Sequence, residues 1–407
     1  SLMDTNVPSQ LDEEYLKAEI ELEIPNTEDE PLLTDTEVEI EVTEEEDGGA
    51  TVDFNPEDEK SEVGFTENLA EELSDRELGR ISSELLSEFD ANKASRQEWE
   101  DAYTDGLELL GFNYEERSQP FRGASGVTHP LLAEAATQFR AQAFNELLPS
   151  SGPVRTIVMG DETRAKADQA DRVRQFMNYY ITNIMEDYTP DMDQMLFYLP
   201  LAGSTFKKVY FDEVAGRAMS KFVPAEQLIV PYETSDLDEC PNVTHVIRMG
   251  LNDLRKQQLA GVYRDIPVIP VQGDASEVQS EIDRISGVEP SQIDYDCTLL
   301  ECHVDLDLDG FEEVDADNEP TGVKLPYIVT ISQDNGQILS IRRNYKEDDE
   351  LKRKIQYFVH FKFLPGFGFY GLGLIHTIGG LSRTATAALR QLIDAGTLSN
   401  LPAGFKA

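Results

Sequence analysis

The sequence has few basic residues. It contains 34 Lys and Arg against 79 Asp and Glu, which gives its 407 residues a formal net charge of −45 at pH 7. Tight binding of nucleic-acid phosphates needs clusters of Lys and Arg that release counterions, and the sequence contains no such cluster. This composition excludes a protein that holds DNA firmly, so any contact with a polyanion should be weak.

Cysteines and long apolar runs are also scarce. The three cysteines, Cys240, Cys297 and Cys302, form no CxxC pair. This usage excludes a disulfide framework and is typical of reduced thiols in a protein core. No stretch reaches the roughly 18 apolar residues of a membrane span. We therefore expect a chain that folds in a cytoplasm and has no membrane contact.

Residues that would form a catalytic site are missing as well. The five histidines are scattered and form neither HExxH nor a helical pair with a carboxylate partner. The run 123–127 (GASGV) resembles a nucleophile elbow, but Val127 stands where the second glycine is needed. Gly368, Gly371 and Gly373 lack the GK[ST] sequence of a phosphate-binding loop. We expect no catalytic residues and no cofactor, and hence no enzyme.

One acidic motif leaves an alternative open. The run 305–310 (DLDLDG) matches the start of a calcium-binding loop, but Ala316 occupies the twelfth position, where a bidentate Glu is needed. The favoured interpretation is a strand that ends in an acidic turn. The alternative is a metal-dependent hydrolase whose metal ligands would be Asp305, Asp307 and Asp309.

The N-terminal stretch is strongly acidic. Residues 1–70 carry 24 acidic residues, 7 Asp and 17 Glu, against two basic ones. A segment with such one-sided charge cannot bury enough apolar surface to offset the entropy of ordering it. We therefore expect residues 1–72 to form a disordered acidic tail, which could serve as an interaction arm.

Apolar residues recur at helical spacing in residues 73–202, which predicts a helical region. Ser74 is the expected N-cap of its first helix, and Ser95 with Glu98 predicts a second capping box. Gly111 should end the second helix. The expected helices cover residues 78–89, 99–110, 131–148, 165–185 and 191–199.

The pattern changes to strands in residues 203–363, a predicted β-rich region of mixed α+β character. The sequence Asp-Asn-Gly at 334–336 is a strong hairpin-turn signal. Short helices are expected at 252–260 and 275–286. The expected strands cover residues 206–211, 228–230, 243–247, 297–306, 327–332, 338–342 and 357–363.

Residues 364–407 combine a glycine- and aromatic-rich loop with a long helix from Leu374 to Gly396. Small residues in the helix would allow close approach of another helix. Since the sequence stops at Ala407 without a termination signal, we expect the natural polypeptide to continue. The apolar stripe of this helix is Leu374, Ile378, Leu381, Ala385, Ala388, Leu389 and Leu392.

Residues 357–406 closely resemble a segment of the podovirus-type portal proteins of tailed bacteriophages. The resemblance rests on the runs YFVH at 357–360, PGFGFYG at 365–371 and LPAGF at 401–405. Earlier runs support it: GAS at 123–125, HPLL at 129–132, ELLP at 146–149, GPV at 152–154, ECH at 301–303, GFE at 310–312 and KLPY at 324–327. The resemblance covers about residues 75–407.

The resemblance implies an α+β fold with a helical wing-like region, a β-rich region and a stem or channel helix. It also implies a homo-oligomeric ring of about twelve subunits. The apolar stripe of the helix that begins at Leu374 is then our candidate for the subunit contacts and the channel. Such a ring occupies one capsid vertex of the virion, after assembly in the host cytoplasm, and double-stranded DNA is packaged and ejected through it.

The implied partners are the major capsid protein, the scaffold, the terminase large subunit and a head–tail adaptor, with transient non-specific contact to DNA. Another head–tail connector or minor capsid protein, which would bind a preformed ring, is the alternative within the same class.

Overall fold

The computed structural model describes only part of the chain: residues 41–44, 50–53, 64–112, 114, 116–161, 163–212, 215–268, 277–287, 296–314 and 319–400. The chain divides into two compact units, Ser1–Glu62 and Val63–Ala407. In the first, β1 (Glu41–Glu44) and β2 (Ala50–Asp53) pair antiparallel. The rest of the predicted disordered tail up to residue 63 lies outside the described residues.

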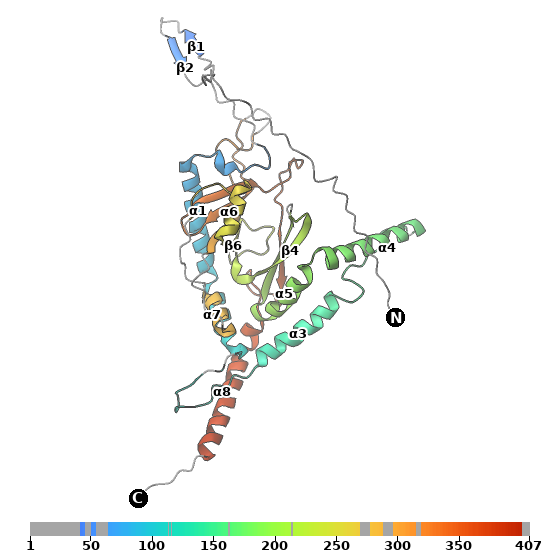
Figure 1. The fold of residues 1–407 in the computed structure, drawn as a ribbon, viewed down its shortest axis with the longest axis vertical. Helices are drawn as coiled ribbons and strands as arrows, with labels where there is room; N and C mark the ends of the chain where they lie inside the picture. The colour runs from blue at the N-terminus through green and yellow to red at the C-terminus, as the bar shows by residue number, and fades with distance from the viewer. Residues whose placement is uncertain are drawn as a thin grey trace, which may run out of the picture. The chain divides into compact units, whose positions relative to one another are not determined.

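The second unit combines helices and sheets, as expected for an α+β chain (Figure 1). Each helix predicted from apolar spacing is present. Ser74 caps α1 as predicted, accepting a hydrogen bond from the Glu77 amide at 3.3 Å. The helices are α1 (Asp75–Ser95), α2 (Gln97–Leu107), α3 (Leu131–Leu147), α4 (Arg164–Tyr179), α5 (Tyr188–Ala202), α6 (Leu251–Leu259), α7 (Glu277–Ser286) and α8 (Leu374–Asn400).

Two predicted helix boundaries are wrong. Ser95 is not an N-cap, because α1 runs through it and its hydroxyl donates to the Asn92 carbonyl. Arg96 precedes α2 and provides no side-chain cap. The last helix does not end at Gly396 but continues to Asn400. A glycine inside a helix costs about 1 kcal/mol relative to alanine, which neighbouring residues can offset.

Among the described residues of this unit, the strands form two antiparallel sheets. One has three strands in the order β10-β3-β4, and the other has five in the order β5-β6-β7-β8-β9. Only β4 was not predicted from the sequence. The strands are β3 (Ser204–Asp212), β4 (Arg217–Pro224), β5 (Leu228–Ile229), β6 (Asn242–Gly250), β7 (Asp296–Leu306), β8 (Leu325–Ser332), β9 (Ile338–Arg343) and β10 (Phe358–Lys362).

The five-stranded sheet is covered on both faces. Because side chains alternate along a strand, β7 contributes to two separate hydrophobic clusters. Leu300, Cys302 and Val304 share a cluster with the apolar face of α1. Cys297 and Leu299 belong to a second cluster, which contains Leu254 of α6. The sheet therefore lies between α1 and α6.

The predicted boundary of the acidic tail at residue 72 is wrong. Residues 64–72 belong to the second unit, and Leu69 and Ala70 are fully buried against the five-stranded sheet. The Asn68 side chain accepts a hydrogen bond from the Ile341 amide of β9 at 2.9 Å. This edge contact orders a segment whose composition alone resembles the tail.

A buried ionic contact joins the two sheets. Lys208 of β3 donates to the Glu301 carboxylate of β7 at 2.6 Å, and His303 Nε2 lies 2.8 Å from the same oxygen. Burial alone would raise the pKa of Glu301, but the bond to His303 and the charge of Lys208 outweigh it and hold that pKa well below its usual range. The ionised carboxylate thus helps to fix the sheets together.

A helical layer covers the three-stranded sheet. Met195 of α5 is fully buried, in a cluster that also includes Phe139 of α3 and Phe222 of β4. A bidentate ion pair between Arg140 and Asp193 adds a second link between α3 and α5. By contrast, α4, which is described along its full length, buries none of its side chains.

Stability should depend on two histidines that the fold keeps neutral. Burial lowers the pKa of both His245 and His360 to about 3, against about 6.5 in an unfolded chain. Below pH 6.5 the unfolded chain therefore binds protons that the folded chain does not. The free energy of unfolding should fall as the pH drops from about 6.5 toward 3, by up to about 1.4 kcal/mol per pH unit for a fully buried histidine.

Urea unfolding at pH 7, 6 and 5 measures this dependence. The His245→Gln variant should show a shallower loss of stability toward acid than the unsubstituted protein, because one of the buried histidines with a lowered pKa has been removed. Identical slopes for the two proteins would contradict the assignment.

Candidate oligomerisation surface

The glycine-rich loop before α8 packs backbone to backbone against the end of α5. Gly203 ends that helix with φ of +85°. A Cβ atom at Gly371 would overlap the Gly203 carbonyl, and one at Gly373 would overlap the Leu201 carbonyl. The glycines of residues 364–373 therefore let this loop lie directly against the backbone at the end of α5.

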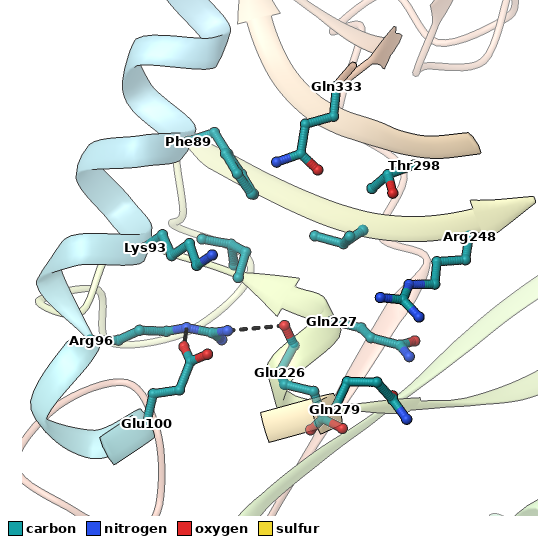
Figure 2. Close-up of a pocket in the computed structure, with 12 residues that line it drawn as sticks. Phe89, Lys93, Arg96, Glu100, Glu226, Gln227, Arg248, Gln279, Thr298 and Gln333 are labelled. Carbon is teal, nitrogen blue, oxygen red and sulfur yellow. Dashed lines mark hydrogen bonds and ion pairs between the residues drawn. The ribbon is translucent and has the colours of Figure 1, made fainter. Parts of the chain in front are cut away.

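Arg96, between α1 and α2, holds this loop from the inside. Its side chain is 1% exposed, and its Nε donates to Glu100 at 3.1 Å. The guanidinium lies 5.3 Å from the Tyr370 ring centroid and donates to the Tyr370 hydroxyl at 3.1 Å. Its remaining hydrogen bonds, one of them drawn in Figure 2, go to the carbonyl oxygens of Ala225, Glu226 and Leu228.

Trp99 of α2 connects the loop to the first turn of α8. Its ring stacks on Tyr370 at 4.8 Å and on His376 at 5.9 Å between centroids. Its indole nitrogen donates to the Gly371 carbonyl at 3.3 Å. His376 in turn accepts a hydrogen bond from the Gly373 amide at 3.1 Å through Nδ1. These contacts fix the position at which α8 begins.

The first half of α8 packs against α2. Ile375 is buried over Gly106, where any Cβ atom would overlap the isoleucine side chain. Leu374 and Ile378 are partly buried against the same core. These two members of the predicted stripe therefore stabilise the fold of their own chain.

The second half of α8 is held by a polar contact with the loop that precedes α3. Three side chains of the helix bind backbone groups of residues 125–129, so this face of α8 is buried although it is polar. The bonds join Asp394 to the Ser125 amide (2.7 Å), Thr386 to the His129 amide (3.0 Å) and Arg390 to the Val127 carbonyl (2.7 Å).

The predicted apolar stripe therefore divides between two faces of α8. Its other members point partly or wholly to solvent: Ala385 and Leu389 are half-buried, while Leu381 and Leu392 are 67% and 72% exposed. We call the exposed side the outer face of α8. It consists of Leu381, Ala388, Leu392 and Ala395.

The buried face of α8 was missed by the sequence analysis. The first four recur every three to four residues and the fifth follows after eight, which is a helical signal, but several are small or polar and so do not register as an apolar stripe. They are Ile375, Gly379, Ser382, Thr386 and Asp394.

The three candidate metal ligands lie at the end of β7 and in the turn that follows. All three are exposed, while Leu308 between two of them is buried. Among the described residues, no group of three or more His, Cys, Asp or Glu side chains is placed to hold a metal ion. The arrangement is that of a strand ending in an acidic turn. The aspartates are Asp305, Asp307 and Asp309.

The close approach of loop and helix predicts opposite effects for two substitutions. Gly373→Ala should lower the free energy of unfolding by about 1–3 kcal/mol, because its methyl group would overlap the Leu201 carbonyl. Gly380→Ala, in open space on α8, should raise it by about 0.5–1 kcal/mol, since alanine is the better helix former. Urea unfolding measures both, and equal effects would contradict the packing described.

Comparison with known proteins assigns no family to this chain. Neither a scan against protein-family models nor a search of curated proteins finds a match. In the described part of the chain, no helix has the length and apolar character needed to cross a bilayer.

Proposed function

We propose that this chain is the subunit of a portal ring of a tailed bacteriophage, through which double-stranded DNA is packaged and ejected. The proposal rests on the portal-like segment 357–406 together with one observation: α8, which lies within this segment, presents an apolar outer face that is largely exposed in the part of the chain that the structure describes. A structural role of this kind requires no catalytic residues.

The outer face is suited to a second copy of the chain. Burial of one leucine side chain stabilises an interface by roughly 1.5–3 kcal/mol, and both Leu381 and Leu392 are available. The alanines between them let a neighbouring helix approach closely. Since the buried face of α8 is occupied by its own loop and core, a neighbour can use the outer face without disturbing the subunit.

Ring closure needs a heterologous contact that repeats around an axis. A helix fixed at its start by Trp99 and along its length by residues 125–129 has a defined direction in every subunit. Such a rigid helix can repeat the same contact from copy to copy. We therefore propose that α8 lies at subunit boundaries, in the stem or channel part of the ring.

The charge of the chain suits a conduit. A net charge of −45 repels DNA phosphates, so a polymer passing through the ring would meet no strong binding site. By resemblance, the same ring would occupy a capsid vertex and contact the major capsid protein and the scaffold. Terminase and a head–tail adaptor would then bind it in turn.

One substitution on the outer face should prevent assembly. Leu392→Asp places a charge where the neighbouring copy would bury apolar surface, whereas it should change the stability of the single chain by no more than about 0.5 kcal/mol. Sedimentation velocity should show the loss of the large species and the appearance of monomer.

Leu259→Asp on α6 is the matched control, because Leu259 is 73% exposed and Leu392 is 72% exposed. The control variant should assemble like the unsubstituted protein. Equal assembly of Leu392→Asp and the control would contradict the placement of α8 at the subunit boundary.

Covalent cross-linking offers a second test. Ala388→Cys places a thiol on the outer face, while the three native thiols are buried. A bifunctional thiol reagent should convert this variant into a ladder of multimers on a denaturing gel. Leu259→Cys should give no such ladder, and matching products from both variants would argue against the interface.

A further inference from the structure

A cavity of about 140 Å³, lined by both polar and apolar side chains, lies beside Arg96 and Glu100 (Figure 2). Side chains from α1, β6, β7 and α7 and from the connection between β4 and β5 line it. Its volume is well above the roughly 10–15 Å³ that one water molecule needs. It can therefore hold a small ligand, but not one of nucleotide size.

Two cations face this cavity from different elements. Lys93 lies in the last turn of α1, and Arg248 lies on β6. Figure 2 shows the two side chains reaching toward the cavity from opposite sides. Within the described part of the chain, neither makes an ion pair or a side-chain hydrogen bond, although the chain carries more than twice as many acidic as basic residues.

Further donors surround the same space. Arg96 Nη2 makes one hydrogen bond, to the Glu226 carbonyl, and so has a second N–H group beyond that bond. The side chains of Gln227 and Gln333 line the cavity and make no hydrogen bond with other described residues. The lining thus combines positive charge with several uncommitted N–H donors.

Glu226 supplies the one acidic group of the lining that has no ion pair, since Glu100 is paired with Arg96. The buried Oε2 atom of Glu226 has no partner among the described residues. Burial raises the pKa of this carboxyl to about 7, so near neutral pH it carries a proton much of the time and can donate a hydrogen bond. The cavity is therefore net positive.

We infer that this cavity binds a small tetrahedral oxyanion of the phosphate class. Lys93 and Arg248 would neutralise its charge, and the amides of Gln227 and Gln333 with the free N–H group of Arg96 would donate to its oxygens. Such an anion would connect α1 to the five-stranded sheet. The inference is independent of ring assembly.

Thermal unfolding in inorganic phosphate tests the site. The midpoint temperature of unfolding of the unsubstituted protein should be at least about 2 °C higher in phosphate than in chloride at equal ionic strength. The reason is that a ligand that binds the folded state stabilises it. The double variant Lys93→Met, Arg248→Gln should lose this shift. A variant with Lys256→Met and Arg255→Gln, which removes two exposed cations of α6, should keep it.

An equal phosphate shift in both double variants, or no shift in the unsubstituted protein, would overturn the inference. A second measurement needs no variant. Phosphate should slow the acetylation of Lys93 by acetic anhydride at least about threefold, read by mass spectrometry, and leave that of Lys256 unchanged. Equal acetylation of Lys93 with and without phosphate would count against the site even if the substituted proteins failed to fold.

Discussion

The buried guanidinium of Arg96 is the contact on which the arrangement of the second unit depends. A buried cation is costly unless it is paired and hydrogen-bonded, and here Glu100 balances the charge while backbone carbonyls and the Tyr370 hydroxyl accept the remaining bonds. These partners come from α2, from residues 225–228 between β4 and the start of β5, and from the loop before α8. One side chain thus ties together three segments that are far apart in the sequence.

The position of α8 follows from this contact. Tyr370, held by Arg96, stacks on Trp99, and Trp99 stacks on His376 in the first turn of the helix. The glycines of the preceding loop let its backbone lie directly on Gly203. With its start fixed in this way and its polar side bound to residues 125–129, α8 keeps its outer face exposed. In the proposed ring this geometry makes subunit contact possible.

Local signals predicted most of the secondary structure, because apolar spacing, Ser74 and Gly111 act within a few residues of themselves. Features that depend on residues far away in the sequence were not predicted correctly. The apparent capping box at Ser95 could not reveal that Arg96 binds the β4–β5 connection. The buried face of α8 was hidden because its polar residues are satisfied by a loop more than 250 residues earlier, as for Asp394 and Ser125.

Charge matters to the proposed function at two scales, that of the whole chain and that of a single cavity. Over the whole chain the excess of acid opposes firm contact with DNA, as a conduit requires. Although the chain as a whole is acidic, Lys93 and Arg248 give one cavity a local positive charge, and this charge favours a small anion as its ligand. The ring proposal depends on the outer face of α8, whereas the anion site depends on the joint between α1 and the sheet.

Electron microscopy of the purified protein in negative stain shows whether copies of this chain close into a ring around an opening, as we propose. Closed rings of uniform size with a central hole are the expected result. Fields of single compact particles at high protein concentration, or open filaments without closure, would contradict it.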